Sequence, residues 1–309
     1  MKIVYFGSSQ FSSKVLEGIV REGIKPVLVV TVPDKPQGRG LKVLPNPVKE
    51  LSLRLHLEVE SISNLNNSDF LGRLKALSCD LFLVVSYGRI LSASLLSIPN
   101  KLPLALHPSL LPRYRGPAPI QWVLIKGEKE TGISIFKVTP KVDSGPIILQ
   151  KRMSIENKDD YFSLSEKLAN LSIPAVCEAI EQIESNTYKL IPQDESKVSY
   201  APKLKKEDGR INWSSSAVTI NNLIKGLKGW PGTYTFYRGI RVKILEAEPN
   251  STETNSSPGF IVDLDKEGIY VATLEGVLKI KKLKPEGKKE MSTNSFICGY
   301  RPKVGEQFE

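Results

Sequence analysis

The chain has 309 residues with 40% hydrophobic side chains, and its 43 Lys and Arg exceed its 33 Asp and Glu by ten charges. This length predicts two domains of roughly 200 and 100 residues, and no apolar run reaches the ~20 residues that a membrane-spanning helix needs, which excludes a membrane protein. The positive excess is denser after residue 200, where 18 basic side chains face 13 acidic ones, against 25 and 20 before it, and this favours a polyanionic partner.

The N-terminus reads as a strand, a tight turn and a helix. Lys2–Phe6 is a short apolar run, Gly7 ends it, and apolar residues from Val15 to Val20 recur at helical spacing, with Ser8 or Ser9 as the helix cap. This unit opens a doubly wound α/β domain. It has only one glycine of the G-x-G-x-x-G pattern, which excludes a dinucleotide site. Because the chain begins directly with a strand, we expect no leader segment and a cytoplasmic location.

A basic loop follows the second predicted strand, Val27–Val32. Residues 33–47 read PDKPQGRGLKVLPNP, and their four prolines and two glycines predict a loop without helix or strand. Lys35, Arg39 and Lys42 make the loop basic, and a glycine on each side of Arg39 lets the backbone approach a phosphate that the guanidinium binds. A long loop of this kind is often functional. The alternative is a solvated surface loop.

Predicted helices and strands alternate up to the stretch that carries chemistry. His107 ends an apolar run that begins at Leu102, and Asp143 follows a second run, Ile133–Val138. Ligands of α/β sheets bind at the carboxyl ends of strands. We therefore expect His107 and Asp143 to meet in one crevice, where the aspartate fixes the tautomer of the imidazole and stabilises its protonated form. Taken alone, a packed histidine and an aspartate in a turn are the alternative.

The second half predicts a long helix, a linker and a small β domain. Apolar residues recur at helical spacing over Asp159–Glu184, where Pro174 is expected to kink or split the helix. Residues 212–230 look helical, and short alternating runs after residue 233 predict a small β-barrel. The predicted domains are residues 1–188 and 208–309, joined by a linker at 189–207. Three widely spaced cysteines without C-x-x-C spacing predict neither a disulfide nor a metal site.

One continuous string of residues resembles a known enzyme family. HPSLLPRYRGPAPIQ from His107, TGISIF from Thr131 and Asp-Ser-Gly at Asp143 resemble the signature of the 10-formyltetrahydrofolate-dependent formyltransferases. Y-A-x-K-L, I-x-W and W-P-G motifs extend the likeness to the last hundred residues, as in members that formylate initiator methionyl-tRNA. The resemblance implies an α/β fold, with a Rossmann-like doubly wound formyltransferase domain followed by a small OB-like β-barrel domain that binds tRNA.

The resemblance also implies a set of site residues. It gives His107 and Asp143 catalytic roles, takes 10-formyltetrahydrofolate as co-substrate and requires no metal. The implied folate-binding residues are Ser109, Leu110, Leu111, Pro112, Tyr87, Gly88 and Ile90. Phe11 is implied to enclose the methionyl end of the acceptor, with a core anchor as the alternative. The implied tRNA contacts are Arg39, Lys42, Lys203, Lys205 and Lys206, each of which has a solvated surface charge as its alternative.

Ala105 departs from the family pattern. The family has Asn-x-His, and the amide of that Asn donates a hydrogen bond to the oxygen of the reacting formyl group, whereas Ala105 has no donor. Loss of one such donor lowers a rate by about 10²–10³-fold, so we predict a slower enzyme. An engineered substitution, a natural lesion and a natural variant with another donor are all open.

These observations predict formyl transfer from 10-formyltetrahydrofolate to the α-amino group of methionyl initiator tRNA by a monomer with no membrane partner. A formyltransferase that acts on a small amine acceptor is one alternative, and it leaves the last hundred residues without a role. A non-catalytic tRNA- or folate-binding relative, marked by Ala105, is the other. Binding of tRNA that weakens steeply with salt separates the tRNA hypotheses from the small-acceptor one.

Overall fold

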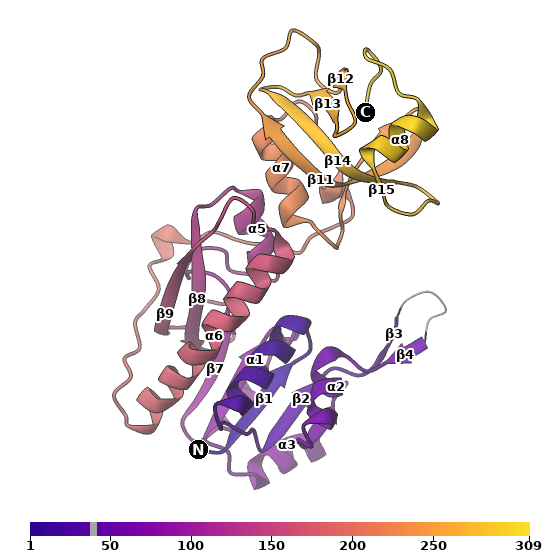
Figure 1. Cartoon of the computed structure of the whole chain (residues 1–309). Coiled ribbons are helices and arrows are strands. Elements are labelled where there is room, and N and C mark those ends of the chain that lie inside the picture. Colours follow the sequence, from indigo (N-terminus) through magenta and orange to yellow (C-terminus); the bar gives the residue numbers. More distant parts are fainter. Residues whose placement is uncertain (38–41) are drawn as a thin grey trace. The chain divides into compact units, whose positions relative to one another are not determined.

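The computed structural model describes residues 1–37 and 42–309, and the chain divides into two compact units (Figure 1). Unit 1 comprises Met1–Pro119, Glu130–Ser154 and Leu164–Pro202, and unit 2 comprises Ile120–Lys129, Ile155–Ser163 and Lys203–Glu309. Across the described ranges, no helix has both the length and the apolar character needed to cross a membrane.

Unit 1 is built on a seven-stranded sheet. Five strands run parallel, in the order β5 (Val59–Ser61), β2 (Leu28–Thr31), β1 (Ile3–Gly7), β6 (Leu81–Val85) and β7 (Leu102–His107). The sheet continues with β8 (Glu130–Lys137) and β9 (Ile147–Ser154), which are antiparallel to their neighbours. The sequences of β1 and β6, IVYFG and LFLVV, are apolar throughout, as expected of strands that are covered on both faces.

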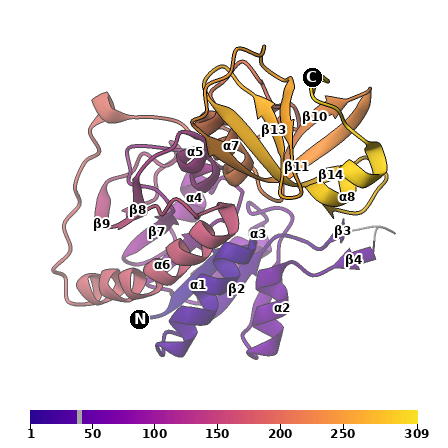
Figure 2. The ribbon, with the colours of Figure 1, turned by 45° about the horizontal axis from the view of Figure 1, so that its top comes forward.

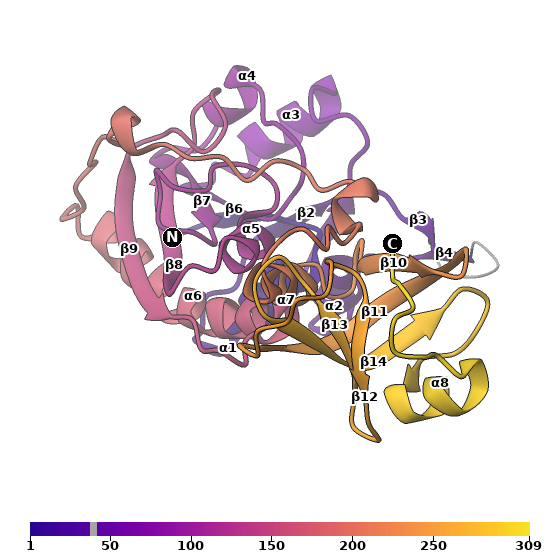
Figure 3. The same ribbon diagram turned by 90° about the horizontal axis from the view of Figure 1, so that it is seen from above.

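Helices cover both faces of this sheet, which confirms the doubly wound prediction (Figure 3). One face carries α3 (Ser68–Ala76) and α4 (Ala93–Leu96), and the other carries α1 (Gln10–Arg21), α2 (Pro47–Arg54) and α6 (Tyr161–Glu184). Ser9 caps α1 by accepting from the Ser12 amide. α1 and α6 approach closely at Gly18, where a Cβ would lie 2.2 Å from Ile173 Cδ1. α6 continues through Pro174 without being split.

A two-stranded hairpin corrects the prediction that residues 33–47 contain no strand. β3 (Lys35–Gln37) and β4 (Lys42–Leu44) pair antiparallel, with Pro36 opposite Val43. Proline has no amide hydrogen to donate. It is tolerated here because each strand of a two-stranded pair is an edge strand, with one side that forms no hydrogen bonds to another strand. The proline and glycine content of this segment did not reveal these two strands.

Unit 2 is an antiparallel β domain (Figure 2). Its strands follow the order β10 (Thr233–Tyr237), β11 (Ile240–Asn250), β14 (Val277–Pro285), β13 (Ile269–Ala272) and β12 (Ile261–Leu264), and β15 (Met291–Ser292) pairs with β14. Unit 2 also contains three helices, which are α5 (Pro119–Ile125), α7 (Ala217–Gly226) and α8 (Thr293–Tyr300). α7 is shorter than the predicted helix at 212–230 because Ser216 caps it, after a turn in which Asn212 accepts from the Ser214 amide.

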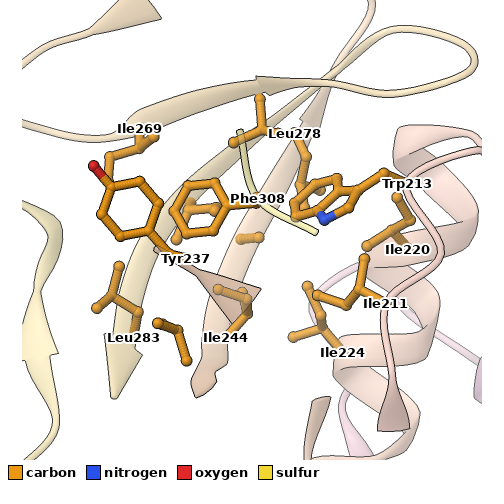
Figure 4. Packing of buried hydrophobic residues seen from close by; sticks show 14 of the residues in the cluster. Ile211, Trp213, Ile220, Ile224, Tyr237, Ile244, Ile269, Leu278, Leu283 and Phe308 are labelled. Atoms are coloured by element: carbon orange, nitrogen blue, oxygen red, sulfur yellow. The ribbon is translucent and has the colours of Figure 1, made fainter. Parts of the chain in front are cut away.

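The chain terminus closes this sheet into the predicted small barrel. Phe308 forms a bridge with Tyr237 on β10, and Gln307 forms one with Phe260, next to β12, so the tail joins the two ends of the strand order. The Phe308 side chain is fully buried, and its ring lies 5.0 Å from that of Tyr237 and 6.1 Å from that of Trp213 (Figure 4). The last residues are therefore part of the core of unit 2.

Candidate active site

The strand order of unit 1 reverses between β1 and β6. From β1 the chain moves outward to β2 and β5, and from β6 it moves the other way to β7. In sheets of this type, ligands bind beyond the carboxyl ends of the strands at such a reversal. Ser8, which follows β1, joins the two loops there, since its hydroxyl lies 3.1 Å from the Ser86 carbonyl oxygen and 3.2 Å from that of Tyr87. The loop that holds Tyr87, Gly88 and Ile90, which are predicted to bind folate, therefore begins at the expected edge.

His107 and Asp143 come together, but by a different route from the one predicted. β8 is antiparallel to β7, with Ser134 opposite His107 and Lys137 opposite Leu104. The carboxyl end of β8 therefore lies next to the start of β7, so the two residues do not follow neighbouring strand ends at one edge. The loop after β8 returns along the sheet instead and brings the Asp143 carboxylate within 3.6 Å of His107 Nδ1.

The two nitrogens of His107 have different surroundings. Nε2 lies 2.8 Å from the Tyr114 carbonyl oxygen, which can only accept, so Nε2 carries a proton and donates it. Nδ1 faces Asp143 Oδ2 at 3.6 Å. The side chain of His107 is 8% exposed and that of Asp143 is 19% exposed. Nδ1 is consequently the nitrogen that is available for proton exchange, with a carboxylate positioned to stabilise its protonated form.

Backbone conformation and hydrogen bonds fix the position of Asp143. Its φ of 49° lies in the left-handed region, which is unfavourable for a residue with a Cβ. Its Oδ2 also accepts from the Gly116 amide at 2.8 Å. Gly116 has a φ of 122°, and a Cβ there would lie 2.7 Å from the Ala201 carbonyl oxygen, so glycine is required at this position.

Ser134 organises the predicted folate loop. Its buried hydroxyl donates to the Ser109 carbonyl oxygen at 2.7 Å and accepts from the Leu111 amide at 3.0 Å. Gln150 Nε2 lies 2.8 Å from the same hydroxyl and donates to the Leu111 carbonyl oxygen at 2.9 Å. The Leu111–Pro112 peptide bond is cis. Ser134 thus holds the backbone on both sides of Leu110 and has no donor left for a substrate.

Ala105 occupies a partly buried position on β7, two residues before His107 and therefore on the same face of the strand. Its side chain packs against Leu111, Phe136 and Ile147. A methyl group in this apolar cluster stands where the resemblance predicts the amide of an asparagine. The side chains around Ala105 in this cluster are apolar and supply no hydrogen-bond donor.

The remaining residues that were predicted to bind folate or the acceptor lie in different surroundings. The Tyr87 ring lies in the core of unit 1, packed against Phe6, and burial raises the pKa of its hydroxyl. Only the backbone of Tyr87 is thus available to a ligand, together with Gly88, whose φ is 76°. Ile90 is 75% exposed, whereas Phe11, at the start of α1, is 7% exposed.

The predicted tRNA contacts are only partly described. Lys203, Lys205 and Lys206 are exposed in unit 2. Arg39 lies outside the described residues, and so does the side chain of Lys42. Within the described part of the chain, no group of three or more His, Cys, Asp or Glu side chains is arranged to hold a metal ion.

Sequence reasoning missed the residues that support the His107–Asp143 pair. Gln193 donates to the Asp143 and Gly145 carbonyl oxygens and accepts from Arg115, a side chain only 2% exposed. Gln193 falls in the segment predicted as a linker, the first part of which, through Pro202, belongs to unit 1. A single glutamine in a polar stretch gives no sequence signal for such a role.

Comparison with known proteins agrees with this architecture. Residues 1–180 match the family model described as Formyl transferase, and residues 203–301 match the one described as Formyl transferase, C-terminal domain. The methionyl-tRNA formyltransferase of Thermodesulfovibrio yellowstonii is 40% identical over 303 residues, which are 98% of this chain and 97% of that protein. The one of Dictyoglomus thermophilum is 40% identical over 313 residues, and the match spans the whole of both chains.

Solved structures share the fold at lower identity. An N-formyltransferase from Helicobacter canadensis, in complex with folinic acid and dTDP-3-aminofucose, is 18% identical with a TM-score of 0.67, over 91% of this chain and 99% of that one. HypX from Aquifex aeolicus, in complex with tetrahydrofolic acid, is 18% identical with a TM-score of 0.65, over 99% of this chain and 48% of that one.

A doubly wound sheet that carries a His–Asp pair, followed by an antiparallel barrel, is here the architecture of a formyl transferase with its C-terminal domain. Identity of 40% over nearly the whole chain shows which formyl transferases these are: the chain belongs to the family of methionyl-tRNA formyltransferases. The resemblance stated from the sequence is confirmed.

Proposed function

We propose that this chain transfers the formyl group of 10-formyltetrahydrofolate to the α-amino group of methionyl initiator tRNA. The observation that carries the proposal is the His107–Asp143 pair, in which Nε2 is committed to the Tyr114 carbonyl and Nδ1 faces a carboxylate. Identity of 40% with methionyl-tRNA formyltransferases over the whole chain supports the choice of acceptor. The small-acceptor alternative is not favoured, because this identity extends through the C-terminal domain.

The reaction needs a base, an acid and a stabiliser of negative charge. The neutral α-amine attacks the formyl carbon, which gives a tetrahedral intermediate with an anionic oxygen and a positively charged amine. His107 Nδ1 takes a proton from that amine, directly or through a water, and the proton goes to N10 of the folate as the C–N10 bond breaks. Asp143 stabilises the imidazolium between these two steps. The products are formylmethionyl-tRNA and tetrahydrofolate, and His107 and Asp143 return to their initial states.

Once it is protonated, the imidazole also adds a positive charge to the site in which the oxyanion develops. In the family an Asn amide would add a neutral donor, and Ala105 removes it. On the scale of a lost oxyanion donor, the rate of this chain is expected to be about 10²–10³-fold lower than with the amide. His107 and Asp143 are unaffected by this change, so a slow transferase is the expected result.

Binding of tRNA is assigned to basic residues at two places. Lys203, Lys205 and Lys206 lie at the start of the last segment of unit 2, and Arg39 and Lys42 belong to the basic loop. Phosphate contacts by such side chains release counterions, so the affinity should fall steeply as salt rises. We propose that the protein acts as a cytoplasmic monomer.

The test is a comparison of acceptors. The chain is incubated with labelled 10-formyltetrahydrofolate and with methionyl initiator tRNA, methionyl elongator tRNA or a small amine such as an amino-sugar nucleotide. Formylation of the initiator tRNA alone is the expected result. Transfer to the small amine, with none to tRNA, would favour the small-acceptor alternative, and binding of tRNA without any transfer would favour the non-catalytic one.

A further inference from the structure

A ring of hydrogen bonds runs from the Asp143 carboxylate through neighbouring residues and back to the Asp143 backbone. The proposed reaction assigns no role to the other members of this ring. The Asp143 carboxylate accepts from the Gly116 amide, and the residue before Gly116 is Arg115, whose guanidinium donates to Gln193 Oε1 from Nε at 3.1 Å and from Nη2 at 2.8 Å. Gln193 then donates from Nε2 to the Asp143 carbonyl oxygen at 2.9 Å. The ring therefore contacts Asp143 at its side chain and at its backbone.

Gln193 supports the part of the loop whose conformation is unfavourable. Its Nε2 also donates to the Gly145 carbonyl oxygen at 2.7 Å, so the two bonds lie on each side of Ser144 and fix the turn that begins at Asp143. Asp143 has a left-handed backbone, a conformation that costs energy in a residue with a Cβ, although aspartate tolerates it better than most residues. The two hydrogen bonds from Gln193 Nε2 hold the backbone in this conformation.

The neighbours of Gln193 require an amide at this position. Arg115 can only donate and the two carbonyl oxygens can only accept, so Oε1 must face the guanidinium and Nε2 must face the loop. Glutamate has no N–H for the carbonyls, and methionine bonds to neither side. The orientation of the amide follows from this chemistry.

Arg115 is itself anchored. It is 2% exposed, and its Nη1 and Nη2 bind both oxygens of Glu195, at 3.3 and 2.8 Å, while Lys141 Nζ lies 3.2 Å from Glu195 Oε2. Hydrogen bonds from Arg115 and then from Lys141 lower the pKa of Glu195, so this carboxylate keeps its charge as the pH falls. The Ser199 and Ala201 backbones hold Arg115 as well, since the Arg115 amide donates to the Ser199 carbonyl and the Ala201 amide donates to the Arg115 carbonyl.

We propose that Gln193, oriented by Arg115, is a positioning residue for catalysis: it holds the Asp143 turn so that the carboxylate faces His107 Nδ1. The segment between the two predicted domains thereby forms part of the catalytic site. This inference rests on the proposed formyl transfer, and it deepens that proposal by adding residues that act through Asp143.

The test uses the full chain and two changes at one position. Gln193→Met removes all hydrogen bonds at nearly constant size, and Gln193→Glu keeps the acceptor for Arg115 while removing the donors to the loop. Gln182→Met is the matched control, because Gln182 lies in α6 and its amide bonds only weakly, at 3.4 Å, to Glu178. Both Gln193 variants should lower kcat by roughly tenfold or more, the scale of one or two lost hydrogen bonds, with the KM values for folate and tRNA unchanged.

A second readout does not depend on activity. His56 and His107 are the only histidines of the chain, so imidazole-labelled protein gives two sets of NMR signals, and His56 serves as an internal reference. In both Gln193 variants the His107 signals should move or broaden, while those of His56 stay as in the parent and in Gln182→Met.

These readouts separate the two proposals. If the parent forms no formylmethionyl-tRNA, the proposed function fails, and the His107 signals still decide the role of Gln193. Unchanged kcat and unchanged His107 signals in both Gln193 variants would overturn the positioning role. A raised KM at unchanged kcat would do so as well, because it would place Gln193 in substrate binding. If Gln193→Met fails to fold, Gln193→Glu, which retains the bond to Arg115, decides the question.

Discussion

Ser134 gives the sharpest test of the predicted folate loop. Replacing it with alanine leaves the Leu111 amide and the Ser109 carbonyl oxygen without their partner in a fully buried place, and it removes one of the two bonds of Gln150. Each buried group left unpaired costs about 1–3 kcal/mol. We therefore expect Ser134→Ala to lower the free energy of unfolding of unit 1 by about 2–6 kcal/mol and to raise the KM for 10-formyltetrahydrofolate.

Ser172→Ala is the control for this prediction. Ser172 is equally buried, but its hydroxyl donates only to the Leu168 carbonyl oxygen, which also accepts the helical bond from the Ser172 amide, so no group is left unpaired. Its cost should stay near or below about 1 kcal/mol. Unfolding in urea is followed by far-UV circular dichroism, because all three tryptophans lie in unit 2. Equal losses in the two variants, or an unchanged folate KM in Ser134→Ala, would refute the assignment of Ser134 as the organiser of this loop.

Three further predictions concern unit 2. Phe308→Ala should cost about 3–5 kcal/mol in unfolding followed by tryptophan fluorescence, whereas the exposed Val304→Ala should cost little, and equal costs would contradict closure of the barrel by the tail. Hydrogen bonds from Tyr237 and then from Arg238 lower the pKa of Glu306 from 4.5 to about 2, so this carboxylate adds stability that is present above pH 4.5 and is lost as the pH falls towards 2. Glu306→Gln should flatten that part of the profile of melting temperature against pH, and an unchanged profile would remove Glu306 as its source. For tRNA, Lys205→Ala with Lys206→Ala should reduce the slope of log affinity against log salt by about 1–2, and an unchanged slope would place the phosphate contacts elsewhere.

Local patterns predicted most of the fold. Apolar runs gave the parallel strands, Ser9 was correctly among the expected caps, and short alternating runs indicated the antiparallel domain. The direction of β8 could not be predicted, because alternating apolar residues show that a segment is a strand but not which way its partner runs. The role of Phe308 in closing the barrel could not be predicted either, because it depends on contacts with strands far away in the sequence.

Some residues of the candidate site could likewise be predicted from the sequence, and others could not. His107 and Asp143 stand in a long and specific string, so their pairing could be predicted from sequence, and the structure brings them together. Gln193 could not be predicted, because its partners Arg115 and Asp143 lie 78 and 50 residues away. Positioning residues of this kind become visible only when the fold brings three separate loops into contact.

The most direct measurement is single-turnover formylation of methionyl initiator tRNA by this chain and by Ala105→Asn, under the same conditions and with saturating 10-formyltetrahydrofolate. Restoring the amide two residues before His107 should raise the rate by about a hundredfold, the scale of one oxyanion donor. Equal rates in the two proteins would show that another group already stabilises the oxyanion, and they would contradict the account of this site.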